Sequence, residues 1–258
     1  FLVKGSTDTY FAAWTTTPWT LPSNAALCVS PKDEYVKIKV TKDLDGSERD
    51  VYYIMAKALV SSLFPENEAV CSYIGKDLCG MEYEPLFDYA RDIVNGKKSY
   101  FVVSDSYVTM EDGTGIVHIA PAFGEDDARV GRENNIPFIQ LVDEQGKLPA
   151  VCGEFAGMFV KDADPLIIRK LNVEGKLIKK HAFEHDYPFC WRCDTPLIYY
   201  ARSTWFIAMS SKRQELLKSN SMVNWLPESI RDGRMGDFLE NVIDWGISRE
   251  RYWGTPLP

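Results

Sequence analysis

Short apolar runs rich in Val, Ile and Tyr follow one another through the first half of the chain and predict β-strands. The predicted strands cover residues 35–40, 51–54, 100–103 and 115–119, and the last of them follows a turn that contains glycine. Helical patterns interrupt these strands and prevail later in the chain. Strands first and helices later predict an α+β fold whose centre is a β-barrel or a curled sheet, with helices around it.

Five segments predict helices, at residues 55–64, 125–134, 164–174, 210–219 and 229–239. The second begins with acidic residues, which suit a helix N-terminus because they complement the helix dipole. The third has Pro165 in its first turn and Gly175 just after its end, the arrangement that helix boundaries favour. A turn-forming stretch at 224–227 separates the last two.

The chain has 258 residues, of which 45% are apolar and 13% aromatic, enough for one sizeable core with a smaller lobe attached. No apolar run reaches the roughly 18 residues that would cross a membrane, and residues 1–10 lack the features of a signal peptide. We therefore expect a cytoplasmic protein without membrane contact. Because the chain starts at Phe1 and stops at Pro258 inside a motif-like run, we also expect it to be a piece of a longer chain.

Cysteine spacing and charge place few constraints on the fold or the binding partner. The six cysteines show no regular spacing, and a chain of this length does not depend on disulfides, so we expect reduced thiols. The formal net charge is −8, with 14 Lys+Arg against 24 Asp+Glu in residues 1–160 and 15 against 13 in residues 161–258. Phosphate contacts depend on local cations more than on net charge, so composition neither indicates nor excludes an RNA partner.

The run TTTPWTLPSN at residues 15–24 crowds five hydroxyls, one amide and two prolines into ten positions. Because proline restricts the backbone, such a segment forms a rigid loop that presents its hydroxyls in fixed directions. Hydroxyls and amides can hold a water molecule or a carbonyl oxygen without a metal ion. The alternative is a solvated turn, since these residue types also favour turns.

A second run, residues 112–127, passes from a Gly-rich turn through a short strand and a Pro/Gly loop to an acidic helix start. It predicts His118 at a strand end and Asp127 in the first helical turn. A carboxylate at that place stays ionised and can bind an ammonium group. The alternatives are that Asp126 or Asp127 only caps the helix, and that His118 is a packed core histidine.

TTTPWTLPSN and, later in the chain, GTGIVHIAPAFGEDD at residues 113–127 resemble the two signature segments of the editing domain of isoleucyl-tRNA synthetases, the insertion known as connective peptide 1. The related valyl and leucyl enzymes carry TTRP where this chain has the isoleucyl form TTTP. Two further segments, YPFCWRCDTPL at 187–197 and WGISRERYWGTPLP at 245–258, are also similar to family segments. The last resembles the junction with the aminoacylation domain. All four occur in the family's order across nearly the whole chain.

The resemblance implies roles for the matching residues. The implied catalytic residues, which would line the hydrolytic pocket or bind the α-ammonium group, are Thr15, Thr16, Thr17, Asn24 and Asp127. The implied substrate-binding residues are Trp19, Thr20, His118, Ala120 and again Asp127, with His118 and Thr20 bordering the amino-acid side chain. Hydrolysis of an activated ester needs a positioned water and a fixed carbonyl more than a strong nucleophile, so we do not expect His118 to be a general base.

The resemblance also implies an organisation and an activity. Residues 1–185 would be the editing body, and residues 186–258 the C-terminal part, whose helices and junction lead back to the aminoacylation domain. The expected activity is post-transfer editing, the hydrolysis of valine misattached to tRNA(Ile). Expected partners are the acceptor end of that misacylated tRNA and the rest of the synthetase, and we expect a monomer. Segments like HIGH and KMSKS are missing, so by family analogy this piece cannot charge tRNA.

Cys190 and Cys193 have the spacing of half of a four-ligand zinc site. The other four cysteines form no second pair with this spacing, and the family's other pair would lie before Phe1. We therefore expect no zinc in this piece, and editing itself requires no cofactor.

Two other functions remain open at the level of sequence. The chain could be a binding module that only grips the tRNA acceptor end, or a free-standing metal-independent esterase. The complete TTTPWT and His118/Asp127 segments favour catalysis over binding alone. The missing Gly-x-Ser-x-Gly motif counts against a serine hydrolase.

Overall fold

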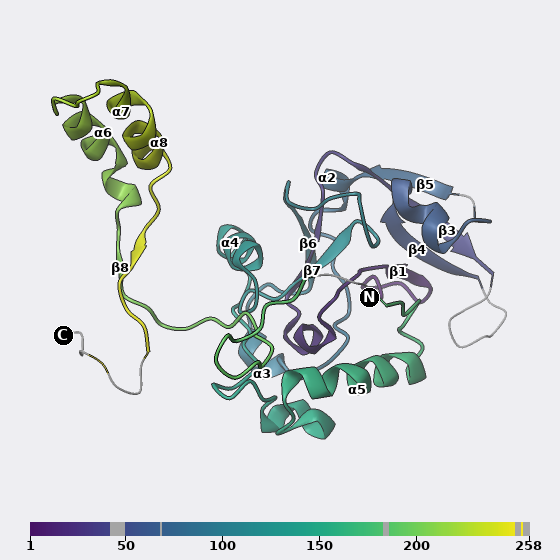
Figure 1. Ribbon diagram of the computed structural model, residues 1–258. Helices are drawn as coiled ribbons and strands as arrows, with labels where there is room; N and C mark the ends of the chain where they lie inside the picture. Colours follow the sequence, from purple (N-terminus) through teal and green to yellow (C-terminus); the bar gives the residue numbers. More distant parts are fainter. Residues whose placement is uncertain (42–49, 68, 183–185, 251–253, 255–258) are drawn as a thin grey trace. The chain divides into compact units, whose positions relative to one another are not determined.

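The computed structural model describes residues 1–41, 50–67, 69–182, 186–250 and 254. The chain forms two compact units, Phe1–Tyr200 and Ala201–Pro258 (Figure 1). The predicted family boundary between residues 185 and 186 remains a prediction about domain organisation.

The first sheet of the larger unit has four strands in the order β1-β4-β3-β5. Its strands are β1 (Thr9–Phe11), β3 (Glu34–Val40), β4 (Val51–Ala56) and β5 (Ala69–Ile74). Strand β1 runs parallel to β4, and β3 runs antiparallel to both of its neighbours. Strands β3 and β4 confirm the strands predicted at 35–40 and 51–54, because their Val, Ile and Tyr side chains pack into the core.

The second sheet has three strands in the order β6-β2-β7. Its strands are β2 (Ala26–Val29), β6 (Phe101–Ser104) and β7 (Ile116–Ile119). Strand β2 runs parallel to β6 and antiparallel to β7, with Leu27 opposite His118. All four residues of β2 are buried. The α+β prediction is confirmed, but the predicted β-barrel at the centre is wrong, because the described strands of the larger unit form two open sheets and no closed barrel.

Two longer helices and one 3₁₀ helix lie near the Thr/Pro-rich loop at residues 15–24. They are η1 (Pro18–Ser23), α4 (Glu125–Glu133) and α5 (Val160–Val173). Helix α5 packs on η1, because Ala163 and Ile167 lie in the same buried cluster as Trp19 and Leu21. Helix α5 begins at Val160, four residues before the predicted start, so Pro165 lies inside the helix and not in its first turn. The buried side chains of Val160 and Ala163 stabilise this additional turn.

The remaining elements of the larger unit are short: η2 (Lys57–Leu59), α1 (Val60–Leu63), α2 (Gly75–Leu78), α3 (Arg91–Val94) and η3 (Ala150–Phe155). The helix predicted at 55–64 is wrong in its first part. Met55 and Ala56 continue strand β4, opposite Val36 and Tyr35 of β3. Cross-strand pairing with a buried neighbour therefore overrides the helical pattern of this apolar run.

The described part of the smaller unit contains three short α-helices, one 3₁₀ helix and one pair of strands. Its elements are β8 (Phe206–Ile207), η4 (Ser210–Lys212), α6 (Arg213–Ser221), α7 (Ser229–Asp232), α8 (Arg234–Glu240) and β9 (Trp245–Gly246). The helix predicted at 229–239 is interrupted at Gly233. Strands β8 and β9 pair antiparallel.

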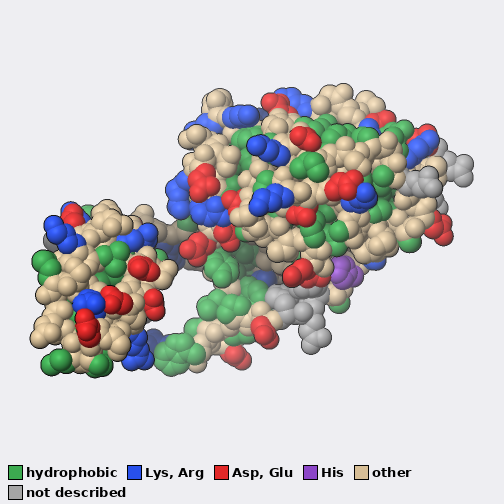
Figure 2. Space-filling view, turned by 90° about the horizontal axis from the view of Figure 1, so that it is seen from above, with side chains coloured by type: hydrophobic (Ala, Val, Ile, Leu, Met, Phe, Trp, Pro, Cys, Tyr) green, Lys and Arg blue, Asp and Glu red, His purple; other side chains and the backbone are tan. Residues whose placement is uncertain are grey.

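Charged side chains of both signs mix on the face of the larger unit that Figure 2 shows. Lys and Arg lie among Asp and Glu there, so the cations on this face do not gather into one patch. Within the described residues, no helix has the length and apolar character needed to cross a membrane.

Candidate active site

The loop at residues 15–24 carries a group of neighbouring hydroxyls, which we call the hydroxyl cluster: Thr15, Thr17 and Thr20. The Thr17 backbone N–H donates to Thr15 Oγ1 over 3.0 Å, and the Oγ1 atoms of these two residues lie 3.3 Å apart. Thr17 Oγ1 and Thr20 Oγ1 are 3.4 Å apart. The loop turns directly into η1, where Pro18 occupies the first helical position and fixes the backbone. The sequence therefore holds three hydroxyls in one place through local geometry.

Contacts from distant parts of the chain hold the end of this loop. Asn24 is buried, and its Nδ2 donates to the Ala26 carbonyl over 2.9 Å. The Tyr83 hydroxyl donates to Asn24 Oδ1 over 2.7 Å. The Leu141 backbone N–H donates to Ser23 Oγ over 3.2 Å. Both ends of the Asn24 amide thus bond within the protein, and its predicted catalytic role stays a prediction.

His118, on β7, joins the hydroxyl cluster from across the fold. Its Nε2 lies 2.9 Å from Thr20 Oγ1, and both side chains are buried. Thr20 Oγ1 donates its single proton to the Thr17 carbonyl over 2.8 Å, so it must accept from His118. His118 therefore carries its proton on Nε2. Burial lowers the pKa of His118 to about 4, which keeps the ring neutral at physiological pH.

A cavity of about 1100 Å³ opens beside the loop. Its lining includes His118 and Asp164 and four residues of the loop, which are Thr15, Thr16, Pro18 and Leu21. Thr17 and Thr20 are not among the described lining residues. The structure thus brings together side chains from the first run, the second run and helix α5. The His118 ring nitrogen Nδ1 is buried and, within the described residues, has no hydrogen-bond partner. A bare Nδ1 fits the Nε2–H tautomer, because that atom then carries only a lone pair.

Asp127 lies in the first turn of α4. Its Oδ2 accepts a hydrogen bond of 2.9 Å from the Ala120 backbone N–H. Burial is the main reason that the pKa of Asp127 is raised to about 6. Gly124 leaves room for this carboxylate, since a Cβ there would lie 3.1 Å from Asp127 Cγ. Asp127 is not among the described residues that line the cavity, so its predicted ammonium-binding role stays a prediction.

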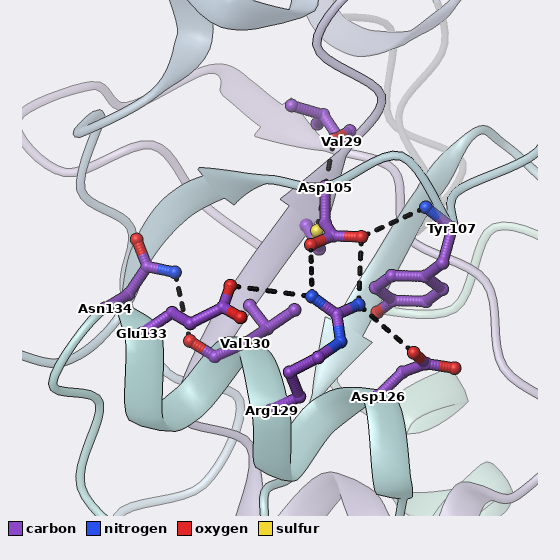
Figure 3. A network of polar contacts seen from close by, with 9 residues as sticks. Val29, Asp105, Tyr107, Asp126, Arg129, Val130, Glu133 and Asn134 are labelled. Carbon is purple, nitrogen blue, oxygen red and sulfur yellow. Dashed lines mark hydrogen bonds and ion pairs between the residues drawn. The ribbon is translucent and has the colours of Figure 1, made fainter. Parts of the chain in front are cut away.

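The carboxylate of Asp126, the residue before Asp127, has a different environment (Figure 3). The Arg129 guanidinium binds both oxygens of Asp105 over 2.7 and 3.0 Å and also binds Asp126 over 3.1 Å. Asp126 thus belongs to a surface ion-pair network that joins α4 to the residue after β6. The N-cap residue of α4 is Gly124, which has no side chain, and the described hydrogen bonds of Asp126 and Asp127 go to Arg129 and to the Ala120 N–H. The helix-cap alternative for Asp126 and Asp127 therefore does not describe their contacts.

The two remaining predicted site residues are buried beside these groups. Trp19 packs edge-on against Phe123, with ring centroids 5.0 Å apart. Ala120 is buried and contributes its backbone N–H to Asp127.

Asp164, which accepts a hydrogen bond from the loop, is a residue that the sequence did not indicate. The Trp19 backbone N–H donates to Asp164 Oδ1 over 2.8 Å. The two residues are 145 positions apart, and an acidic residue in a helix gives no local signal of such a contact.

Cys190 and Cys193 are both free thiols, and Cys193 Sγ lies 3.1 Å from Thr195 Oγ1. Among the described residues, no three His, Cys, Asp or Glu side chains come together as a metal site. Two thiols supply half of the ligands that a structural zinc ion requires. The expectation that this piece holds no zinc stays a prediction.

The fold matches that of a known class of domain. A solved structure described as GlLeuRS-CP1, the connective-peptide part of a leucyl-tRNA synthetase, aligns with 71% of this chain and 87% of its own length at a TM-score of 0.53. Its sequence identity is 15%, so this likeness concerns the fold alone.

Sequence comparison then gives the family. The family model of class I tRNA synthetases (I, L, M and V) matches residues 13–258, and the chain belongs to this family. It is 50% identical over 258 residues to an isoleucine–tRNA ligase of Clostridium acetobutylicum and 48% identical over 263 residues to one of Dehalococcoides mccartyi. The chain spans 24% and 25% of the lengths of these two relatives, which in turn cover 100% and 96% of it. The resemblance predicted from the four sequence segments is confirmed.

Proposed function

We propose that this chain is the editing domain of an isoleucyl-tRNA synthetase and hydrolyses the ester that joins valine to tRNA(Ile). The observation that carries the proposal is 50% identity over the whole chain to an isoleucine–tRNA ligase. The cavity lined by Thr15, Thr16 and His118 supports it. Isoleucyl-tRNA synthetases are the standard illustration of double-sieve editing, in which a second site hydrolyses products that binding alone cannot reject.

The hydroxyls of the loop supply the positioning that hydrolysis requires. Water adds to the ester carbonyl, the bond to the ribose oxygen breaks, and the ribose oxygen receives a proton. The loop hydroxyls beside the cavity can hold the water and the carbonyl oxygen by donating and accepting hydrogen bonds. An ester needs little further activation, so orientation contributes most of the rate enhancement.

His118 acts in this proposal as a wall and not as a base. Its pKa of about 4 makes the ring a weak proton acceptor at neutral pH, and its Nε2–H is engaged by Thr20. A neutral, fixed ring beside the cavity instead limits the size of the amino-acid side chain that enters. Asp127, ionised above its pKa of about 6, supplies the negative charge that an α-ammonium group requires.

The test is deacylation of purified Val-tRNA(Ile) and Ile-tRNA(Ile) by this chain, without ATP and in the presence of a metal chelator. We expect valine to be released and isoleucine to be retained. A requirement for ATP, or no release of valine at high enzyme concentration, would contradict the proposal. Tight binding of the acceptor end without hydrolysis would favour the binding module.

A further inference from the structure

The start of helix η1 lacks the usual cap. Thr17 occupies the N-cap position, where a threonine oxygen ordinarily accepts a hydrogen bond from the N–H of the second or third helical residue. In the described chain, Thr17 makes no such bond. Its Oγ1 instead lies 3.3 Å from Thr15 Oγ1 and 3.4 Å from Thr20 Oγ1, inside the hydroxyl cluster. The Thr17 hydroxyl therefore belongs to the hydroxyl cluster and does not cap its own helix.

A side chain from another helix takes the place of this cap. The backbone N–H of Trp19, the second residue of η1, donates to Asp164 Oδ1 over 2.8 Å. Asp164 is held firmly, because the adjacent Ala163 and Ile167 one turn later are fully buried against the core that contains Trp19. The carboxylate also lines the cavity together with Thr15 and Thr16.

We propose that Asp164 is a positioning residue for the hydroxyl cluster: by accepting from the Trp19 N–H, it leaves Thr17 Oγ1 in contact with Thr15 and Thr20 and so keeps the cluster together beside the cavity. This inference rests on the proposed deacylase function. When Asp164 is removed, the Trp19 N–H loses its acceptor, and the hydroxyl of the N-cap residue Thr17 is the group that ordinarily accepts from this helical position. Thr17 would then rotate to cap its own helix, and the hydroxyl cluster would lose one of its three members.

Burial destabilises the ionised form of the Asp164 side chain. Burial raises the pKa of Asp164 to about 6, so the charged form is disfavoured at this place. An asparagine carbonyl oxygen can accept the same hydrogen bond without a charge. Asp164→Asn is therefore the conservative replacement, and Asp164→Ala is the replacement that removes the acceptor. Asp162→Ala is the matched control, because Asp162 is an exposed aspartate on the same helix.

The experiment measures kcat and KM for Val-tRNA(Ile) deacylation in the whole chain and in these three variants, together with melting temperatures. We expect Asp164→Ala to lower kcat by about tenfold or more, as loss of a charge-assisted hydrogen bond predicts, with KM changed by less than about twofold. Asp164→Asn should retain most of the activity, and Asp162→Ala all of it. In a Thr17→Ala background, Asp164→Ala should add less than about a twofold loss, because it acts through the same hydroxyl.

Hydrogen exchange of the Trp19 amide, followed by NMR in the ¹⁵N-labelled chain, tests the contact without reference to activity. We expect faster exchange in Asp164→Ala and wild-type exchange in Asp164→Asn. Equal activity losses for the Ala and Asn variants, or losses that multiply fully with Thr17→Ala, would overturn the positioning role. If the wild-type chain shows no deacylation, the proposed function fails, and the amide exchange still decides whether Asp164 holds the loop.

Discussion

At the scale of single residues, desolvation determines the protonation states of the titratable side chains near the hydroxyl cluster. Burial lowers the pKa of His118 to about 4 and raises the pKa values of Asp127 and Asp164 to about 6. At pH 7 the histidine is therefore neutral, and both carboxylates are ionised despite their burial. An incoming ammonium group would therefore meet the negative charges of Asp127 and Asp164 and no positive charge on His118.

Replacement of the two neighbouring aspartates on α4 separates substrate binding from surface structure. We expect Asp127→Ala to lose most of the deacylation activity, because an ionic hydrogen bond to an ammonium group contributes roughly 1.5–3 kcal/mol. Asp126→Ala should matter less, since Asp126 lies on the exposed side with Arg129. Deacylation rates and melting temperatures of both variants decide the matter. Equal activity losses accompanied by lower melting temperatures would point to a structural role for both.

Asp127 also makes stability depend on pH. Its pKa is raised on folding, so its contribution is fully present below the unfolded value near 3.8 and is lost as pH rises through about 6. Asp127→Asn removes this loss and keeps an oxygen for the Ala120 N–H. We expect the variant to be more stable than the wild type at pH 8, by at most about 3 kcal/mol, and no more stable at pH 4. Urea unfolding at the two pH values measures this, and a gain of equal size at both would contradict it.

The pair His118 and Thr20 should determine which amino acid the site accepts. Valine lacks one methylene of isoleucine, so a rigid wall can exclude the larger side chain sterically. Because the two residues are buried and hydrogen-bonded to each other over 2.9 Å, neither can move aside easily. We expect His118→Ala or Thr20→Ala to permit hydrolysis of Ile-tRNA(Ile), with a smaller effect on Val-tRNA(Ile). If isoleucine remains protected in both variants while valine is still removed, the wall lies elsewhere.

At the scale of elements, the sequence predicted what local chemistry determines. The strands at β3, β4, β6 and β7 and the helix α4 follow from Val/Ile/Tyr runs and from an acidic helix start. Strand β2 was not predicted, because it is buried along its whole length and its four residues show no alternation. The early start of α5 and the end of β4 depend on packing with distant segments.

The same distinction holds for the site. The Thr/Pro loop and the position of His118 at a strand end were readable from the sequence. The pairing of Thr20 with His118, 98 residues apart, and that of Trp19 with Asp164 were not, because only the folded chain brings them together.

The hydrogen bond from Tyr83 to Asn24, which holds the end of the loop, can be tested by removing the hydroxyl oxygen of Tyr83. Tyr83→Phe keeps the buried ring but leaves Asn24 Oδ1 without its donor, which costs about 1–2 kcal/mol of unfolding free energy. We expect deacylation to fall in parallel in Tyr83→Phe and Asn24→Ala, since both variants release the same end of the loop. Chemical denaturation and turnover measurements provide the comparison. If Asn24→Ala abolishes turnover and Tyr83→Phe preserves it, the amide contacts the substrate directly.

At the scale of the whole molecule, the core is distributed unequally between the two units. Among the described residues, the three clusters of buried apolar side chains all lie within residues 1–200. In the smaller unit Val242 is buried, whereas Leu226 and Trp245 expose 85% and 60% of their surface. Hydrophobic burial is the main source of folding free energy, so the larger unit holds most of the stability.

Truncation after Tyr200 tests this distribution. We expect the fragment 1–200 to unfold cooperatively at a melting temperature within a few degrees of that of the whole chain. The fragment 201–258 alone should show no cooperative transition, because it buries too little apolar surface. Calorimetry of the two fragments gives the answer, and a large drop in the melting temperature of fragment 1–200 would show that the smaller unit stabilises it.

The bond between Trp19 and Asp164 also orders events during synthesis. After a ribosome has added Trp19, it must add 145 more residues before the acceptor of the Trp19 N–H exists. If Asp164 positions the hydroxyl cluster as proposed, Thr17 can cap its own helix until helix α5 has left the exit tunnel. The hydroxyl cluster is then completed only after most of the larger unit has been translated.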